Sequence, residues 1–177
     1  LETHLTSHVD ATHLRGARLL AEQSRHFLIS PQREGAPSVI AGFPWFGEWG
    51  RDAMIALEGL TLDLGRHDEA LGILETFARF EQNGLFPNQL SVSGRSSYNT
   101  VDASLWYFYA VHRYLEVTGD RDGVMHRLFP AAERIVSAYL EGRVPDADID
   151  ETGLLSAGNM QTQLTWMDAS VGGVPVT

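Results

Sequence analysis

LGRHDEALGILETFARFEQNG, residues 64–84, is the stretch from which the fold of this chain can be worked out. Its early glycine, Gly65, ends a predicted helix over 51–64, and its terminal Asn-Gly pair ends a second predicted helix over 67–82. So short a link between two helices is typical of antiparallel neighbours. The stretch therefore predicts a helical hairpin.

Helices are also expected on both sides of this hairpin. Apolar residues recur at helical spacing over 10–29, which predicts an amphipathic helix. Two more helices are expected over 100–117 and 121–143, the second broken at Pro130, because proline suits the first turn of a helix better than its interior. A short hairpin of strands is expected within the acidic, glycine-punctuated segment 144–165.

The loops between these helices are of two kinds. The link at 65 is short, whereas the segments 30–50, 83–99 and 144–165 are long. The first long segment is too irregular for a helix and too apolar for a solvated linker, which is typical of a functional loop. Continuous alternation of strands and helices is missing, which argues against a doubly wound sheet. We expect an all-α fold of antiparallel helix pairs, with the long loops gathered at one end.

The composition narrows the chemistry. The chain has 177 residues, 44% of them hydrophobic, which is about one domain's worth. It contains no cysteine and no lysine, which excludes thiolate catalysis, cysteine metal sites and Schiff-base lysine chemistry within this segment. The net charge of -10 argues against nucleic acid or an anionic membrane as a partner. No apolar run approaches the ~20 residues of a spanning helix, so a cytoplasmic protein is expected.

The first cluster of unusual residues is PWFGEWGRDAMIAL, residues 44–57. Its indoles, Trp45 and Trp49, could stack on sugar rings, and the pair Arg51 and Asp52 offers directional donors and acceptors for hydroxyl groups. A structural interpretation stands beside this one: the aspartate caps a helix and the arginine pairs with a neighbouring acid.

The second cluster, YNTVDASLWYF at 98–108, places an acid at the start of a helix. Asn99 or Thr100 is expected to cap this helix, which puts Asp102 in its first turn. One interpretation is structural, because a helix N-terminus favours an ionised acid. The other is catalytic: the aromatic residues that follow indicate an interior helix opening on a dry pocket, and burial gives a carboxyl the raised pKa that a general acid needs.

The third cluster, QLTWMDA at 163–169, again pairs a tryptophan with an acid, Trp166 with Asp168. Three separate loops with this pairing favour glycoside chemistry, which needs aromatic platforms and carboxylates together. The seven histidines show no metal-ligand spacing, and the glycines form no dinucleotide or phosphate loop. No cofactor and no metal site are therefore expected.

Four blocks together resemble a known family, the amylo-α-1,6-glucosidase domain of glycogen debranching enzymes. They cover roughly 40–177 in family order: AGFPWFGEWGRDAMIALEGLTL (41–62), NGLFPN (83–88), YNTVDASLWYF (98–108) and LTWMDA (164–169). The family usually carries threonine where this chain has Ala53, a departure that removes a hydroxyl and leaves the acids intact.

The resemblance implies an (α/α)6 barrel of twelve helices, of which 1–177 would be a single partial catalytic domain, roughly the first half. It also implies an inverting mechanism, with Asp102 matching the general acid and the general base lying beyond Thr177. The segment by itself is therefore expected to be inactive. Half of such a barrel should expose a large apolar inner wall. The segment by itself is therefore expected to dissolve poorly or to form a homo-oligomer.

The same resemblance implies the substrate, glycogen or a branched oligosaccharide trimmed to α-1,6-linked glucose stubs. Three residues would hold the terminal glucose, namely Trp49, Arg51 and Asp52. Three more would line the pocket, namely Asn99, Trp166 and Asp168. Glu48 is a further candidate.

Other functions stay open at this point. Another (α/α)6 glucosidase would act on α-1,4 links, trehalose-like disaccharides or glycosyl-glycerate, because linkage preference lies in the loops around the site. A sugar isomerase or epimerase on the same toroid would want a histidine acid/base pair, whereas the histidines here lie outside the blocks. A non-catalytic carbohydrate-binding domain would keep the tryptophan platforms and have no need of Asp102.

Overall fold

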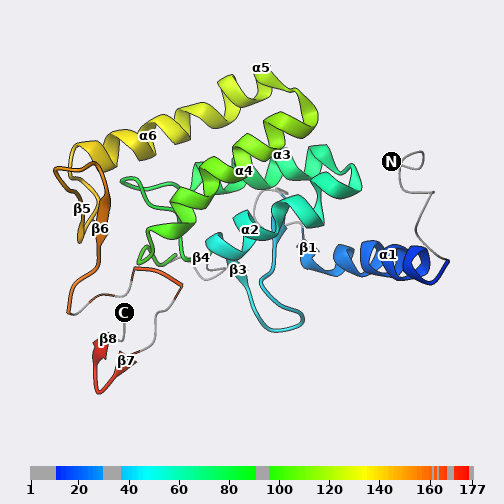
Figure 1. Cartoon of the computed structure of the whole chain (residues 1–177), viewed down its shortest axis with the longest axis horizontal. Coiled ribbons are helices and arrows are strands. Elements are labelled where there is room, and N and C mark those ends of the chain that lie inside the picture. The colour runs from blue at the N-terminus through cyan, green and yellow to red at the C-terminus, as the bar shows by residue number, and fades with distance from the viewer. Residues whose placement is uncertain are drawn as a thin grey trace.

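A computed structural model of the chain shows a helix-rich molecule with short strands confined to its loops (Figure 1). The structure describes residues 11–29, 37–90, 96–160, 162, 164–166 and 170–175. Within these residues, no helix is both long enough and apolar enough to cross a membrane.

The helices follow one another along the chain. They are α1 (Ala11–Gln23), a 3₁₀ turn η1 (Ser24–Phe27), α2 (Gly50–Leu60), a 3₁₀ turn η2 (Leu62–Leu64), α3 (His67–Arg79), α4 (Asp102–Thr118), and the run of α5 (Arg121–Gly123), a π-helical turn η3 (Val124–Leu128) and α6 (Phe129–Leu140). The strands form antiparallel pairs: β1 (Leu28–Ile29) with β2 (Ser38–Val39), β3 (Glu48–Trp49) with β4 (Gln89–Leu90), β5 (Ala147–Ile149) with β6 (Leu155–Ala157), and β7 (Ser170–Val171) with β8 (Val174–Pro175).

The helical expectations are largely confirmed. Gly65 ends the α2–η2 segment in the left-handed conformation, with φ of 69°. Pro130 stands in the first turn of α6, but the expected break there is wrong, because α5, η3 and α6 follow one another directly from Arg121 to Leu140. α3 ends at Arg79, before the predicted Asn-Gly end, and that pair forms the turn between the bridged residues Gln82 and Leu85. The expected hairpin is β5–β6. The first helix is shorter than predicted, because the Ser24 hydroxyl and the Arg66 guanidinium both donate to the carbonyl of Ala21 and the chain tightens there into η1.

The core lies where α4 contacts α2, α3 and α6. Tyr107 of α4 is fully buried and meets the ring of Phe86 edge-on, with ring centroids 4.8 Å apart. Figure 1 shows α4 and α6 running antiparallel, as expected for consecutive helices joined by a short connection. Among the largest fully buried side chains are Met54, Leu57, Ile73, Leu74, Phe77, Phe86, Tyr107, Leu128 and Ile135.

The long loops meet at the N-terminal ends of α2 and α4. The β3–β4 ladder joins the first loop to the second, and Gly50 N–H donates to the Asn88 carbonyl at 3.1 Å. Gly50 has no side chain for a steric reason: a Cβ there would lie 2.4 Å from the carbonyl oxygen of Pro87. Val101 N–H donates to the carbonyl of Leu164 at 2.8 Å, which attaches the third long loop to the start of α4.

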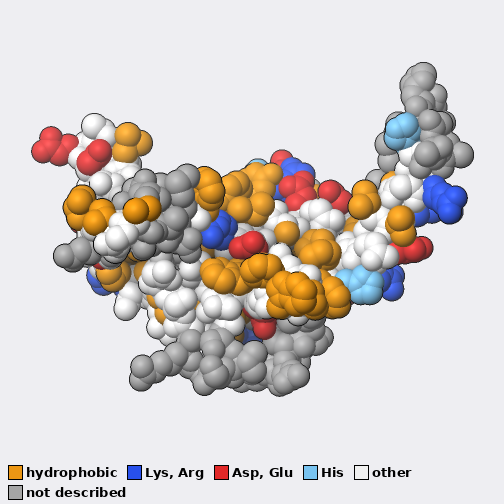
Figure 2. Space-filling view, turned by 90° about the horizontal axis from the view of Figure 1, so that it is seen from below, with side chains coloured by type: hydrophobic (Ala, Val, Ile, Leu, Met, Phe, Trp, Pro, Cys, Tyr) orange, Lys and Arg blue, Asp and Glu red, His pale blue; other side chains and the backbone are white. Residues whose placement is uncertain are grey.

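Hydrophobic side chains also remain at the surface. Figure 2 shows them gathered across one face, around neighbouring acidic and basic side chains. Large apolar residues on α4 that stay exposed include Leu105, Trp106 and Tyr109, and the loop before β3 exposes Phe43, Trp45 and Phe46. A sizeable apolar surface is thus open to contact with something else.

Candidate functional site

An ion pair between Arg51 and Asp102 joins the first turns of α2 and α4. Nη1 of Arg51 lies 3.0 Å from Oδ2 and 3.3 Å from Oδ1 of Asp102. The two side chains are only 15% and 18% exposed, so salt and water screen their attraction less than at an open surface. The sequence suggested each residue separately, and the packing of α2 on α4 brings them together.

Thr100 also binds the carboxylate of Asp102. Its hydroxyl donates to Oδ1 of Asp102 and lies 3.4 Å from the carbonyl oxygen of Leu164. The expectation that Asn99 or Thr100 caps α4 is wrong: the N-cap residue is Val101, and no side chain caps the helix. The threonine hydroxyl turns to the carboxylate instead, because that acceptor is charged and only two residues away.

The backbone around this acid is anchored on α6. The Tyr139 hydroxyl donates to the carbonyl of Val101, 3.4 Å away. Burial raises the pKa of Tyr139 to about 12, and the negative charge of Asp102 adds to the increase. Tyr139 is therefore neutral at physiological pH and remains a hydrogen-bond donor.

Two buried polar atoms without a partner lie at the β3–β4 ladder, one on β3 and one just before β4. Within the described residues, the indole N–H of Trp49 and the side-chain carbonyl oxygen of Asn88 have no hydrogen-bond partner. Glu48 is 9% exposed on the same strand as Trp49. An unsatisfied buried donor or acceptor costs stability, so these atoms are ready to bind water or a ligand hydroxyl.

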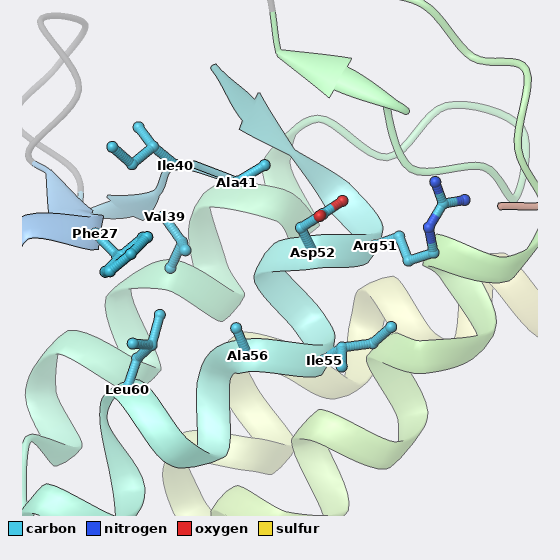
Figure 3. Close-up of a pocket in the computed structure, with 9 residues that line it drawn as sticks. All are labelled: Phe27, Val39, Ile40, Ala41, Arg51, Asp52, Ile55, Ala56 and Leu60. Atoms are coloured by element: carbon cyan, nitrogen blue, oxygen red, sulfur yellow. The ribbon is translucent and has the colours of Figure 1, made fainter. Parts of the chain in front are cut away.

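Asp52 follows Arg51 on α2 and lies at the edge of a hollow of about 330 Å³ (Figure 3). The hollow is otherwise largely apolar, with the polar residues at the start of α2. Its lining comprises Phe27, Val39, Ile40, Ala41, Arg51, Asp52, Ile55, Ala56 and Leu60. Asp52 stands in the first turn of α2 and does not cap it, because Trp49 is the N-cap residue.

The other expected site residues lie further out. Asn99 is exposed just before α4, and Trp166 is 65% exposed, two residues after the Leu164 carbonyl that anchors Val101. Asp168 lies outside the described residues. The structure thus brings Arg51 and Asp102 into contact and leaves Asn99 and Trp166 at the margin.

Thr100 is the residue whose role the sequence did not reveal. It was expected at most as a helix cap, whereas its hydroxyl binds the carboxylate. A hydroxyl residue two positions before an acid at a helix start could have signalled this contact.

The arrangement combines a carboxyl group, a guanidinium, an indole N–H and an amide oxygen around the meeting loops. Such a mixture suits a ligand with many hydroxyl groups. Among the described residues, no group of three or more His, Cys, Asp or Glu side chains could hold a metal ion.

Comparison with known proteins shows similarity to one family and to a protein from yeast. The family model described as amylo-alpha-1,6-glucosidase matches residues 22–177. The glycogen debranching enzyme of Saccharomyces cerevisiae (strain ATCC 204508 / S288c) is 36% identical to this chain over 106 aligned residues, and the alignment covers 55% of this chain and 7% of that protein. The aligned part is therefore a small fraction of the relative's length.

Proposed function

This chain belongs to the amylo-alpha-1,6-glucosidase family, and from that membership we propose that it hydrolyses α-1,6-linked glucose stubs on glycogen or a branched maltodextrin. The observation that carries the proposal is the place of Asp102. This acid stands at the start of α4, where the three long loops meet, with Arg51 on both of its carboxyl oxygens and Thr100 on Oδ1. It is the general acid of the proposed reaction.

The reaction follows the inverting scheme. Asp102 takes up a proton from solvent when Arg51 turns from its carboxylate to the sugar, and this proton moves to the glycosidic oxygen as the bond between that oxygen and the anomeric carbon breaks. A water molecule attacks the anomeric carbon from the opposite face and gives its proton to a second carboxylate. The two carboxyl groups of inverting enzymes stand ~6.5–9.5 Å apart, which leaves room for this water. We propose that the second carboxylate lies outside these 177 residues.

Arg51 and Trp49 are proposed to hold the glucose. Within the described residues, the guanidinium of Arg51 bonds through Nη1 alone, so its Nε and Nη2 donors can bind sugar hydroxyls. The unpartnered indole N–H of Trp49 is a further donor. We assign the same role to Asp52.

The outer pocket completes the proposed site. Asn99 and Trp166 are exposed where an incoming chain can reach them, and an indole face suits the apolar face of a sugar ring. Asp168 is proposed with them on the motif alone. The whole fold is proposed to be an (α/α)6 barrel, to which α2, α3, α4 and α6 would contribute antiparallel pairs.

The first test uses the full-length parent protein and its Asp102→Asn variant. Asparagine keeps the size of the side chain and cannot deliver the proton, so glucose release from α-1,6 stubs should fall by about 10² to 10⁴. Glucose is measured enzymatically, on substrates that carry either an α-1,6 or an α-1,4 terminal glucose.

Asp122→Asn is the matched control, because Asp122 is an exposed acid on α5. It should release glucose like the parent. Unchanged activity in a folded Asp102→Asn protein would refute the general-acid role. A parent that releases glucose from the α-1,4 substrate alone would favour the alternative glucosidase.

A further inference from the structure

We propose that Thr100 is a positioning residue, which holds Oδ1 of Asp102 so that Oδ2 is the oxygen that delivers the proton. This inference rests on the proposed function and assigns separate roles to the two carboxyl oxygens. Thr100 binds Oδ1, whereas the shorter of the two contacts made by Arg51 is to Oδ2, at 3.0 Å.

The hydrogen bonds around Thr100 explain why its hydroxyl serves the carboxylate. A threonine hydroxyl has one proton to donate. The competing acceptor, the carbonyl of Leu164, lies 3.4 Å away and already accepts the Val101 N–H at 2.8 Å. The Thr100 proton is therefore available to Asp102 Oδ1, and the bond to a carboxylate is the stronger one.

The two side chains that bind Asp102 differ in how deeply they are buried. Thr100 is 1% exposed, and its short side chain has a single rotatable bond to the hydroxyl. Arg51 is 15% exposed on its side chain, and that side chain is long enough to turn toward a sugar hydroxyl. When substrate enters, Thr100 stays on Oδ1, and Oδ2 is the oxygen that can be freed.

The chemical step then has a defined geometry. The proton leaves Asp102 Oδ2 for the glycosidic oxygen, the bond from that oxygen to the anomeric carbon breaks, and water adds to the anomeric carbon and yields its proton to the second carboxylate. Throughout, the Thr100 hydroxyl donates to Oδ1 and prevents rotation of the carboxyl plane. Loss of this hydroxyl should misalign the acid without removing it.

The test compares Thr100→Val and Thr100→Ser in the full-length protein on two substrates. Valine matches the shape of threonine without the hydroxyl, and serine keeps the hydroxyl. The first substrate is an α-1,6 glucosyl stub, whose leaving oxygen needs a proton. The second is α-glucosyl fluoride, whose fluoride departs as an anion and needs no proton from the enzyme. A merely structural role would affect both substrates alike.

We expect Thr100→Val to lower kcat on the stub on the order of 10²-fold, as for a misplaced catalytic group, and to leave the fluoride reaction within a few-fold of the parent. Thr100→Ser should retain most of the stub activity. Equal losses on both substrates, or no loss on the stub, would overturn the proposal. If the valine variant does not fold, Thr100→Ala against Thr100→Ser gives the same comparison.

Asp102→Asn, measured beside these variants, separates the two levels of the argument. If Asp102→Asn loses the stub reaction and keeps the fluoride reaction, the general-acid role of Asp102 holds. If Thr100→Val then lacks this selectivity, the positioning role of Thr100 is refuted while the proposed function stands. If Asp102→Asn shows no selectivity either, the proposed function itself fails.

Discussion

Single residues at the meeting of the loops decide how closely the backbone can pack there. Gly50 begins α2 and is buried against the second loop, with its N–H on the carbonyl of Asn88. The carbonyl of Pro87 occupies the space that a side chain would need, and it is backbone, so it cannot turn aside. Arg51 follows directly, and its direction toward Asp102 therefore depends on this close approach.

Gly50→Ala should consequently weaken both the fold and the site. Its Cβ would lie 2.4 Å from a backbone oxygen, so the β3–β4 ladder has to move. We expect a loss of about 1–3 kcal/mol in the free energy of unfolding, as for overpacked sites, together with a slower rate of the proposed glucose release. The melting temperature of the domain and the stub assay measure the two effects.

The control for this change lies on the same helix. Apart from its own chain neighbours and the backbone of its helix, Gly59 has no atom within 4 Å of where its Cβ would stand. Gly59→Ala should therefore stabilise α2 by about 0.5–1 kcal/mol through helix propensity and leave activity unchanged. If both alanine variants behaved alike, the steric account of Gly50 would be wrong.

At the scale of elements, arginine side chains fix how neighbouring helices lie. Arg113 of α4 bonds Glu58 of α2, and Arg127 of η3 bonds Glu75 of α3. These side chains are in partial contact with solvent, so each ion pair adds little stability. In each pair, two guanidinium nitrogens, Nε and Nη2, bond the same carboxylate. This geometry favours one alignment of the helices over others, and a lysine, with its single nitrogen, could not favour it as well.

Buried tyrosines on α4 and α6 make the fold sensitive to alkali. The pKa of Tyr114 and of Tyr139 is raised to about 12, chiefly by burial. The fold thus favours the neutral phenol. The stability that the two neutral tyrosines contribute is fully present below the ordinary tyrosine pKa of about 10 and is lost as the pH rises toward 12.

We expect the protein to unfold cooperatively in that alkaline range, with tyrosinate absorbance rising together with the loss of helical circular dichroism. Tyr139→Phe removes one of these groups and should move the alkaline midpoint to higher pH. Tyrosinate absorbance that rises well before the helices melt would contradict this prediction.

The helices could be predicted from the sequence because their signals are local. Gly65 and Pro130 mark boundaries by their own backbone chemistry. The two-residue strands could not be predicted in this way, because β3 pairs with β4 only after the intervening helices α2 and α3 have packed. The same holds for the site: Asp102 was recognised by its motif, whereas its ion pair with Arg51 depends on how two helices cross.

At the scale of the whole molecule, the exposed apolar face is the main feature. Figure 2 shows groups of hydrophobic side chains on one face of the molecule. Leu105, Trp106 and Tyr109 of α4 are each more than a third exposed. A surface patch of this kind marks a region that binds another surface. In the proposed barrel, the remaining helices would cover part of it.

The isolated 177-residue chain should therefore associate with itself or dissolve poorly. Light scattering after size-exclusion chromatography would show a mass that grows with concentration. Trp106→Gln, on the exposed face, should lessen the association, and Glu133→Gln, an exposed polar site on α6, should not. A monomeric chain that melts cooperatively would overturn the expectation.

The hydrogen bond from Val101 to the Leu164 carbonyl also bears on how the protein is made. Ribosomes add about 5–20 residues per second, so α2, α3 and α4 emerge seconds before Leu164 does. During that interval the core can form while the backbone beside Asp102 still lacks its partner. The nascent chain would acquire its framework first and the fixed geometry of its acid last.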